Sequence, residues 1–197
     1  MQNAFLVTAS IGCGKSAFIK IANSLGFKSI SADEISHQIL DENAKELAFI
    51  FNDTKLLYKQ KIDRKYLGNL VFSDNIAKKR LEEFILPKIR KELLEQMTIL
   101  NKKNQFFFVE IPLLFESRAY ENLGKTILIY STKEQSLARI IQRDNLSKEE
   151  AKKRLNAQMD IEEKLLLADF VLYNTSSYED FKQKCILFLE KLSKGKL

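Results

Sequence analysis

Short apolar segments alternate with amphipathic segments along most of the chain. The apolar runs predict five strands, at 4–8, 27–31, 106–109, 126–130 and 169–173. Apolar residues at helical spacing predict four helices, over 15–25, 133–143, 148–159 and 178–193. Strands that alternate with helices are typical of an α/β fold with an open parallel sheet. We therefore predict a single α/β domain over residues 1–197.

The stretch from about 35 to 100 differs, because its apolar positions are spaced as in helices throughout. Pro87 is expected to kink or break one of these helices, since proline lacks a backbone donor and clashes with the preceding turn. This insertion falls between the second and third predicted strands. There it would cover the strand ends at which parallel α/β sheets bind ligands.

The composition is that of an ordinary globular protein, with 45% hydrophobic and 29% charged residues. No apolar run approaches the roughly 20 residues that a membrane-spanning helix needs, and the N-terminus does not resemble a signal peptide. We therefore expect a cytoplasmic protein with no membrane partner. The net charge of +6 suits a polyphosphate substrate, and the basic residues are dispersed without stacking aromatics, so no nucleic-acid partner is expected.

The first predicted strand leads into the sequence FLVTASIGCGKS, at 5–16, and then into a helical pattern. This order matches a phosphate-binding loop, in which backbone N–H groups and a helix N-terminus favour an anion. Gly12 and Gly14 would let the backbone approach phosphate, Lys15 adds a positive charge, and the Ser16 hydroxyl is a candidate Mg²⁺ ligand. Ala9 replaces the motif's first glycine, where a left-handed alanine would cost about 1–2 kcal/mol.

The two cysteines, Cys13 and Cys185, do not suggest a disulfide framework or a zinc site. Cys185 shares a helical stripe with Phe181 and Phe188, which predicts a core residue. Cys13 lies in the phosphate loop and has two interpretations. It is either a small residue at a variable loop position, which we favour, or a thiol whose pKa is lowered at a helix N-terminus.

Two carboxylates follow predicted strands. Asp33 comes just after the second strand, where it could accept a hydroxyl proton near a transferring phosphate, or could instead cap the helix that starts near Glu34. Glu110 ends the 106–109 strand, where an acid often holds Mg²⁺ through water, although it could also accept a nearby loop N–H.

Several basic residues are candidates for phosphate contacts. Arg139 and Arg143 are four residues apart and share one helix face, so they could clamp a transferring phosphoryl group or form a solvated basic face. Beside a phosphate loop we favour the clamp. His37, the only histidine, either contacts substrate phosphate or is an ordinary surface residue.

The chain resembles the bacterial dephospho-coenzyme A kinase family over nearly its whole length. The segments that carry this resemblance are TASIGCGKS (8–16), SADEISHQIL (31–40), DRKYLGNLVF (63–72), LEEFILPKIR (81–90), EIPLLFES (110–117), RIIQRDNLSKEEAKKRLNAQM (139–159) and ADFVLYN (168–174). Seven collinear segments are far more specific than one loop motif.

The resemblance implies a P-loop kinase core with a helical substrate-binding insertion at about 35–100 and a lid at about 139–159. The implied reaction, the last step of coenzyme A biosynthesis, transfers the γ-phosphate of ATP to the ribose 3′-hydroxyl of dephospho-CoA. It assigns the residues from Gly12 to Ala17 to the ATP phosphates, Asp33 to the base, Asn174 to the loop near adenine, and Arg139 and Arg143 to the lid. Asp33, His37 and Arg64 are then the expected substrate-binding residues, and a monomer is the default expectation.

The sequence departs from the family pattern at Ala9, Ser31, Leu86 and Glu110. None of these changes removes Lys15, Ser16 or Asp33. The phosphate loop also fits two other functions: a kinase for another nucleotide or small alcohol on the same fold, and a GTPase-like switch or nucleic-acid ATPase. The latter is disfavoured because the segment 101–104, NKKN, ends in the wrong residue for a guanine-binding motif and precedes a strand.

Overall fold

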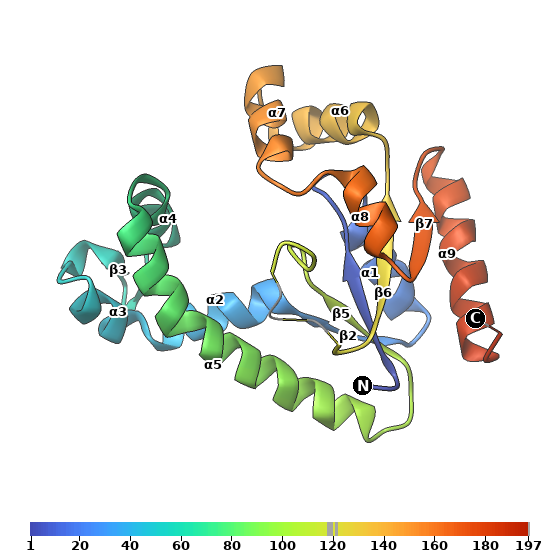
Figure 1. Ribbon diagram of the computed structural model, residues 1–197, viewed down its shortest axis with the longest axis horizontal. Coiled ribbons are helices and arrows are strands. Elements are labelled where there is room, and N and C mark those ends of the chain that lie inside the picture. Colours follow the sequence, from blue (N-terminus) through green and yellow to red (C-terminus); the bar gives the residue numbers. More distant parts are fainter. Residues whose placement is uncertain (118–119, 121, 197) are drawn as a thin grey trace. The chain divides into compact units, whose positions relative to one another are not determined.

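The computed structural model describes residues 1–196 apart from 118, 119 and 121 (Figure 1). The chain forms two compact units, which are described separately below. The first unit contains residues 1–31 and 97–197, and the second contains residues 32–96.

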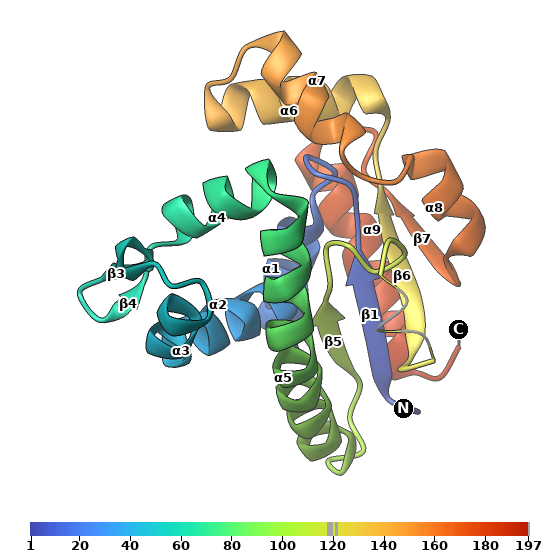
Figure 2. The same cartoon turned by 60° about the vertical axis from the view of Figure 1, so that its left-hand side comes forward.

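The first unit is built on a five-stranded parallel sheet with the order β2-β5-β1-β6-β7. The strands are β1 (Ala4–Thr8), β2 (Lys28–Ser31), β5 (Phe107–Glu110), β6 (Lys125–Tyr130) and β7 (Phe170–Tyr173). Figure 2 shows β1 between β5 and β6. Every residue of β1 is buried, as expected for a central strand that is covered on both faces. The α/β fold and all five expected strands are confirmed, with ends shifted by at most one residue.

The helices of this unit are α1 (Lys15–Ser24), α6 (Lys133–Asp144), α7 (Lys148–Asn156), α8 (Ile161–Leu167) and α9 (Tyr178–Ser193). Helices α1 and α9 contribute to the same core, in which the rings of Phe18 and Phe188 lie 6.5 Å apart and Cys185 is fully buried. Ser147 caps α7 in a complete capping box with Glu150. Helix α8 was not expected, because its seven residues are too few for a clear period.

The second unit contains α2 (Ala32–Glu42), α3 (Ala44–Ile50), the 3₁₀ turn η1 (Thr54–Leu56), β3 (Leu57–Tyr58), β4 (Lys61–Ile62), α4 (Arg64–Ser73) and most of α5 (Asn75–Asn101). The expectation of helix throughout is therefore wrong at 57–62, where β3 and β4 form an antiparallel hairpin. Its two turn residues, Lys59 and Gln60, have φ angles of 48° and 65°, values for which Asn-Gly is the usual sequence signal.

Pro87 does not break α5, which runs without interruption from Asn75 to Asn101. Ile85, Ile89, Leu93 and Met97 are buried and recur every four residues, so one continuous apolar stripe favours one continuous helix. No helix in the described part of the chain is long and apolar enough to cross a membrane.

Candidate active site

The chain leaves β1 through a short loop that enters α1 at Lys15. Gly12 and Gly14 have φ angles of 81° and 102°, which residues with a Cβ rarely adopt. A Cβ at Gly12 would lie 2.6 Å from the carbonyl oxygen of Ser136, and one at Gly14 would lie 2.4 Å from Nδ2 of Asn174. Both the backbone conformation and the close neighbours therefore require glycine at these two positions.

Ala9 needs no such allowance. It is not among the residues with positive φ, and it is buried, with 2% of its surface exposed. The cost of a left-handed alanine therefore does not arise, and the departure from the motif's first glycine is compatible with the loop.

Side chains from distant parts of this unit hold two carbonyl groups of the loop. Nη1 of Arg139 donates to the carbonyl of Gly12 at 3.4 Å, and Nδ2 of Asn174 donates to the carbonyl of Cys13 at 2.8 Å. The C=O and N–H groups of a trans peptide point in opposite directions. The bond from Asn174 therefore turns the N–H of Gly14 away from the side of the loop on which Asn174 lies.

The N–H groups at the start of α1 are available to a ligand. Within the described residues, no acceptor contacts the N–H groups of Gly14, Lys15 or Ser16. The first N–H groups of a helix have no intrahelical partner, and the helix dipole adds positive potential at the same place. The loop therefore has the geometry of a phosphate site.

Lys15 forms an ion pair with Glu110, the last residue of β5. The two side chains are 14% and 18% exposed, so the pair is largely shielded from solvent. Neither expectation for Glu110 included this contact. Within the part of the chain that the structure describes, the carboxylate accepts no loop N–H; instead it holds the Lys15 ammonium at the carboxyl edge of the sheet.

The two candidate clamp arginines have different surroundings. Arg139 is tied to the core: besides its bond to the loop, it donates to Oγ of Ser131 at 3.0 Å and to the carbonyl of Asn174 at 3.1 Å. Arg143 is 61% exposed and forms a bidentate pair with Asp144, at 2.7 and 2.9 Å. This pair lowers the pKa of Asp144. The structure thus brings Arg139, and not Arg143, to the phosphate loop.

Asn174, which lies in the loop expected near adenine, also contacts the phosphate loop. It is 8% exposed, and its backbone N–H donates to the carbonyl of Tyr130 at 2.7 Å. Its side chain braces the phosphate loop through the bond from Nδ2 to the Cys13 carbonyl, and the place near adenine stays a prediction.

Cys13 is buried, with 1% of its surface exposed, and its Sγ lies 3.3 Å from Oγ of Ser136. Burial raises the pKa of this thiol. The hypothesis of a thiol with a lowered pKa is therefore wrong, and the favoured interpretation of a small loop residue is retained. Cys185 is a core residue as expected, and burial raises its pKa to about 12.

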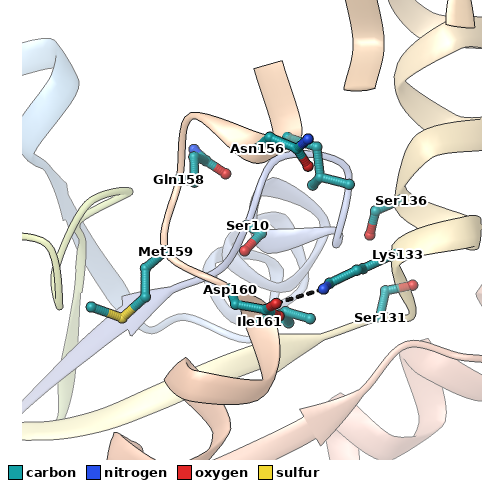
Figure 3. Close-up of a pocket in the computed structure, with 10 residues that line it drawn as sticks. Ser10, Ser131, Lys133, Ser136, Asn156, Gln158, Met159, Asp160 and Ile161 are labelled. Carbon is teal, nitrogen blue, oxygen red and sulfur yellow. Dashed lines mark hydrogen bonds and ion pairs between the residues drawn. The ribbon is translucent and has the colours of Figure 1, made fainter. Parts of the chain in front are cut away.

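A cavity of about 230 Å³ adjoins the loop (Figure 3). Ser10, Ser131 and Ser136 contribute hydroxyl groups to its wall, and Lys133 forms an ion pair with Asp160 at 2.5 Å. The hydroxyl of Ser10 is buried and has no hydrogen-bond partner within the described residues. Sequence reasoning assigned no role to any of these residues, since single serines and a lysine carry no motif.

In the second unit, the candidate substrate residues gather along α2. Asp33 and His37 are exposed and, with Asp41, recur every four residues, so all three lie on one face of the helix. Arg64 joins this face, because its Nη2 donates to Asp41 at 2.7 Å. Asp33 lies within the first turn of α2 and is not its cap, so the capping interpretation is not supported.

A divalent ion has few protein ligands to choose from here. No group of three or more His, Cys, Asp or Glu side chains in the described part of the chain could hold a metal. Ser16 is exposed in the first turn of α1, beside the free N–H groups. One hydroxyl fits Mg²⁺, which usually keeps several waters and binds together with substrate phosphates.

Comparison with known proteins agrees with this geometry. The family model for dephospho-CoA kinase matches residues 5–180. A dephospho-CoA kinase of Campylobacter jejuni (strain RM1221) is 64% identical over 201 aligned positions, which cover 100% of both proteins. A solved dephospho-CoA kinase structure from Campylobacter jejuni superposes with a TM-score of 0.84 at 64% identity, and covers 100% of each chain.

A more distant structure is informative about the fold alone. The shikimate kinase of Acinetobacter baumannii superposes with a TM-score of 0.52 at 12% identity, over 100% of this chain and 96% of that one. The match of the family model and the full-length identity are decisive: the chain belongs to the dephospho-CoA kinase family.

Proposed function

We propose that this phosphotransferase moves the γ-phosphate of ATP to the ribose 3′-hydroxyl of dephospho-CoA, giving CoA and ADP. The observation that carries the proposal is the loop before α1, where three N–H groups are free and Lys15 is held by Glu110. In phosphoryl transfer, positioning and charge stabilisation supply most of the catalysis. This loop offers both.

Lys15 and the loop N–H groups would stabilise the negative charge that develops on the transferring phosphoryl group. Arg139 would act from the side of the loop to which it is already bonded. Arg143 would reach the phosphates only after it leaves Asp144, in a motion of the lid at 139–159. The residues from Gly12 to Ala17 form the proposed ATP phosphate site.

Asp33 is the proposed base. The chain leaves β2 at Ser31, whose register partner on β5 is Glu110, and Asp33 follows two residues later. A carboxylate in this place could orient the acceptor hydroxyl and accept its proton. His37 and Arg64 share the same helix face and are proposed to bind the anionic groups of dephospho-CoA.

Mg²⁺ would be held by the Ser16 hydroxyl together with phosphate oxygens and water. When bound, it would neutralise part of the phosphate charge. A monomer and a cytoplasmic location stay as predictions. The alternative, a kinase for another nucleotide or small alcohol, shares the loop and differs in the acceptor.

The test is a panel of acceptors with the purified protein, ATP and Mg²⁺. We expect ADP formation only with dephospho-CoA, and CoA as the product by mass spectrometry. Equal or faster turnover with adenosine, AMP or shikimate would favour the alternative. ADP formation without any acceptor would contradict both.

A further inference from the structure

The connector between α7 and α8, residues 157–160, is bound at three points to the rest of its unit. Oε1 of Gln158 accepts the N–H of Ile11 at 2.8 Å. The N–H of Met159 donates to Glu116 at 3.0 Å, and Asp160 pairs with Lys133 at 2.5 Å. A solvent-facing turn would not need these bonds, so the connector has a defined position beside the phosphate loop (Figure 3).

The bond from Gln158 fixes the orientation of one peptide unit in the loop. The N–H of Ile11 and the C=O of Ser10 belong to the same trans peptide, so they point in opposite directions. The N–H donates to Gln158, and the C=O accepts the N–H of Cys13 at 3.2 Å, which closes the tight turn that contains Gly12. An acceptor on one end of this peptide therefore sets the hydrogen bond at its other end.

Glu116 and Lys164 fix the connector in turn. Lys164 lies on α8 with a side chain that is 0% exposed, and its ammonium is 2.8 Å from Oε1 of Glu116. The same oxygen accepts the N–H of Met159, the residue after Gln158. Removing the partner of a buried charge is strongly destabilising, so Glu116 has little freedom to move away from Lys164.

We propose that Gln158 is a positioning residue for phosphate binding, which holds the Ser10–Ile11 peptide in the orientation that the loop needs before ATP arrives. Arg139 and Asn174 hold the carbonyls of Gly12 and Cys13, and Gln158 is the only one of these three side chains that acts on an N–H. A loop that is ordered beforehand loses less entropy on binding, so the gain is in ATP affinity. This inference rests on the proposed function in one respect only, namely that the ligand of the loop is ATP.

The test compares three variants. Gln158→Leu removes the acceptor at similar volume, and Gln158→Glu keeps an accepting oxygen. Gln183→Leu is the matched control, since Gln183 is exposed on α9, outside the proposed site, and its side chain makes no hydrogen bond within the described residues. The first measurement needs no ATP: amide hydrogen exchange of the Ile11 N–H in the nucleotide-free protein. We expect about tenfold less protection in Gln158→Leu, and native protection in the other two.

The second measurement separates positioning from general stability. In Gln158→Leu the KM for ATP should rise about tenfold, while kcat and the KM for dephospho-CoA stay within about twofold of the native enzyme. Native exchange and native ATP KM in Gln158→Leu would overturn the proposal. So would a parallel loss for both substrates together with a lowered Tm, because that pattern indicates a structural role alone. Failure of the native protein to use ATP with dephospho-CoA would instead count against the proposed function.

Discussion

We predict that phosphoryl transfer depends on Lys15 more than on any other side chain. Lys15→Ala should lower kcat by at least about a thousandfold, because the lost charge acts directly on the transferring phosphate. The fold should persist, since the removed ammonium is at the edge of the sheet and Glu110 keeps partial access to solvent. Activity and Tm are measured beside Lys20→Ala, an exposed lysine of α1. Near-native kcat in folded Lys15→Ala would contradict the assigned site.

A substitution of Asp33 tests whether this residue is the catalytic base or a structural carboxylate. Asp33→Asn should keep ATP affinity within about twofold and lose about a hundredfold or more in kcat, because an amide cannot accept the proton. Its Tm should be unchanged, since Asp33 is exposed and does not cap α2. Glu46→Gln, exposed on α3 in the same unit, is the control. If kcat is retained, Asp33 is not the base.

The burial of the two cysteines predicts how their thiols react at a given pH. Burial raises the pKa of Cys13, and that of Cys185 to about 12, so both stay as thiols in the folded protein well above pH 8. Since the thiolate is the nucleophile, iodoacetamide at pH 8 should label neither residue in the native state. The urea-unfolded protein at the same pH should be labelled at both. Rapid native labelling of Cys13 would revive the reactive-thiol hypothesis.

At the residue scale, what the sequence predicts is local. Gly12, Gly14 and Lys15 belong to one short motif whose chemistry is set by adjacent residues. The partners of this motif are remote: Glu110 lies 95 positions after Lys15, and Asn174 lies 161 positions after Cys13. No single-sequence pattern brings such residues together, which is why neither the bond from Asn174 to the phosphate loop nor the role of Gln158 is predictable from the sequence.

At the scale of elements, the spacing of apolar residues predicts those helices and strands that bury these residues in the core. The five strands are apolar runs, and they form the sheet almost residue for residue. The failures occur where the period is short or conflicts with another rule. The β3–β4 hairpin has two residues per strand, α8 has seven residues, and the buried stripe of α5 outweighs the preference of Pro87 for a helix end.

The mobile segment of the lid should be shorter than the predicted range 139–159. The middle of α6 is tied to the core by Arg139, and the connector at 157–160 is tied by Gln158. Between them, Asn145 has a φ of 51°, and α7 buries only Ala151. Segments with few buried contacts open most easily. The mobile part of the lid should therefore be 145–156.

Hydrogen exchange tests this boundary. A non-hydrolysable ATP analogue should slow exchange over 145–156, as this segment closes over the bound phosphates. Residues 133–140 should be protected with and without the analogue, because their anchors are already present. Equal and strong protection of 145–156 in both states would show a fixed helix, and the lid would have to be abandoned.

At the scale of the whole molecule, the two units divide the candidate residues between them. The phosphate loop, Arg139 and Asn174 belong to the first unit, and Asp33, His37 and Arg64 belong to the second. The division is not visible in composition, since no linker separates the units and α5 crosses the boundary. The net charge of +6 belongs to the first unit, since residues 32–96 contain twelve basic and twelve acidic residues, and it favours an anionic ligand there.

This division predicts two separate ligand footprints. In hydrogen exchange, the ATP analogue alone should protect 10–17 most strongly, because its phosphates would accept the free N–H groups there. Dephospho-CoA alone should protect the α2 face from Asp33 to Asp41 and the start of α4, where Arg64 lies.

Arg64→Ala should weaken the protection by dephospho-CoA and leave the protection by the ATP analogue unchanged, since the only side-chain hydrogen bond of Arg64 in the described residues is to Asp41 of the same unit. Gln183→Leu, on α9, should alter neither. If dephospho-CoA protects only the first unit, then the insertion does not bind the acceptor, and both His37 and Arg64 lose their assignment.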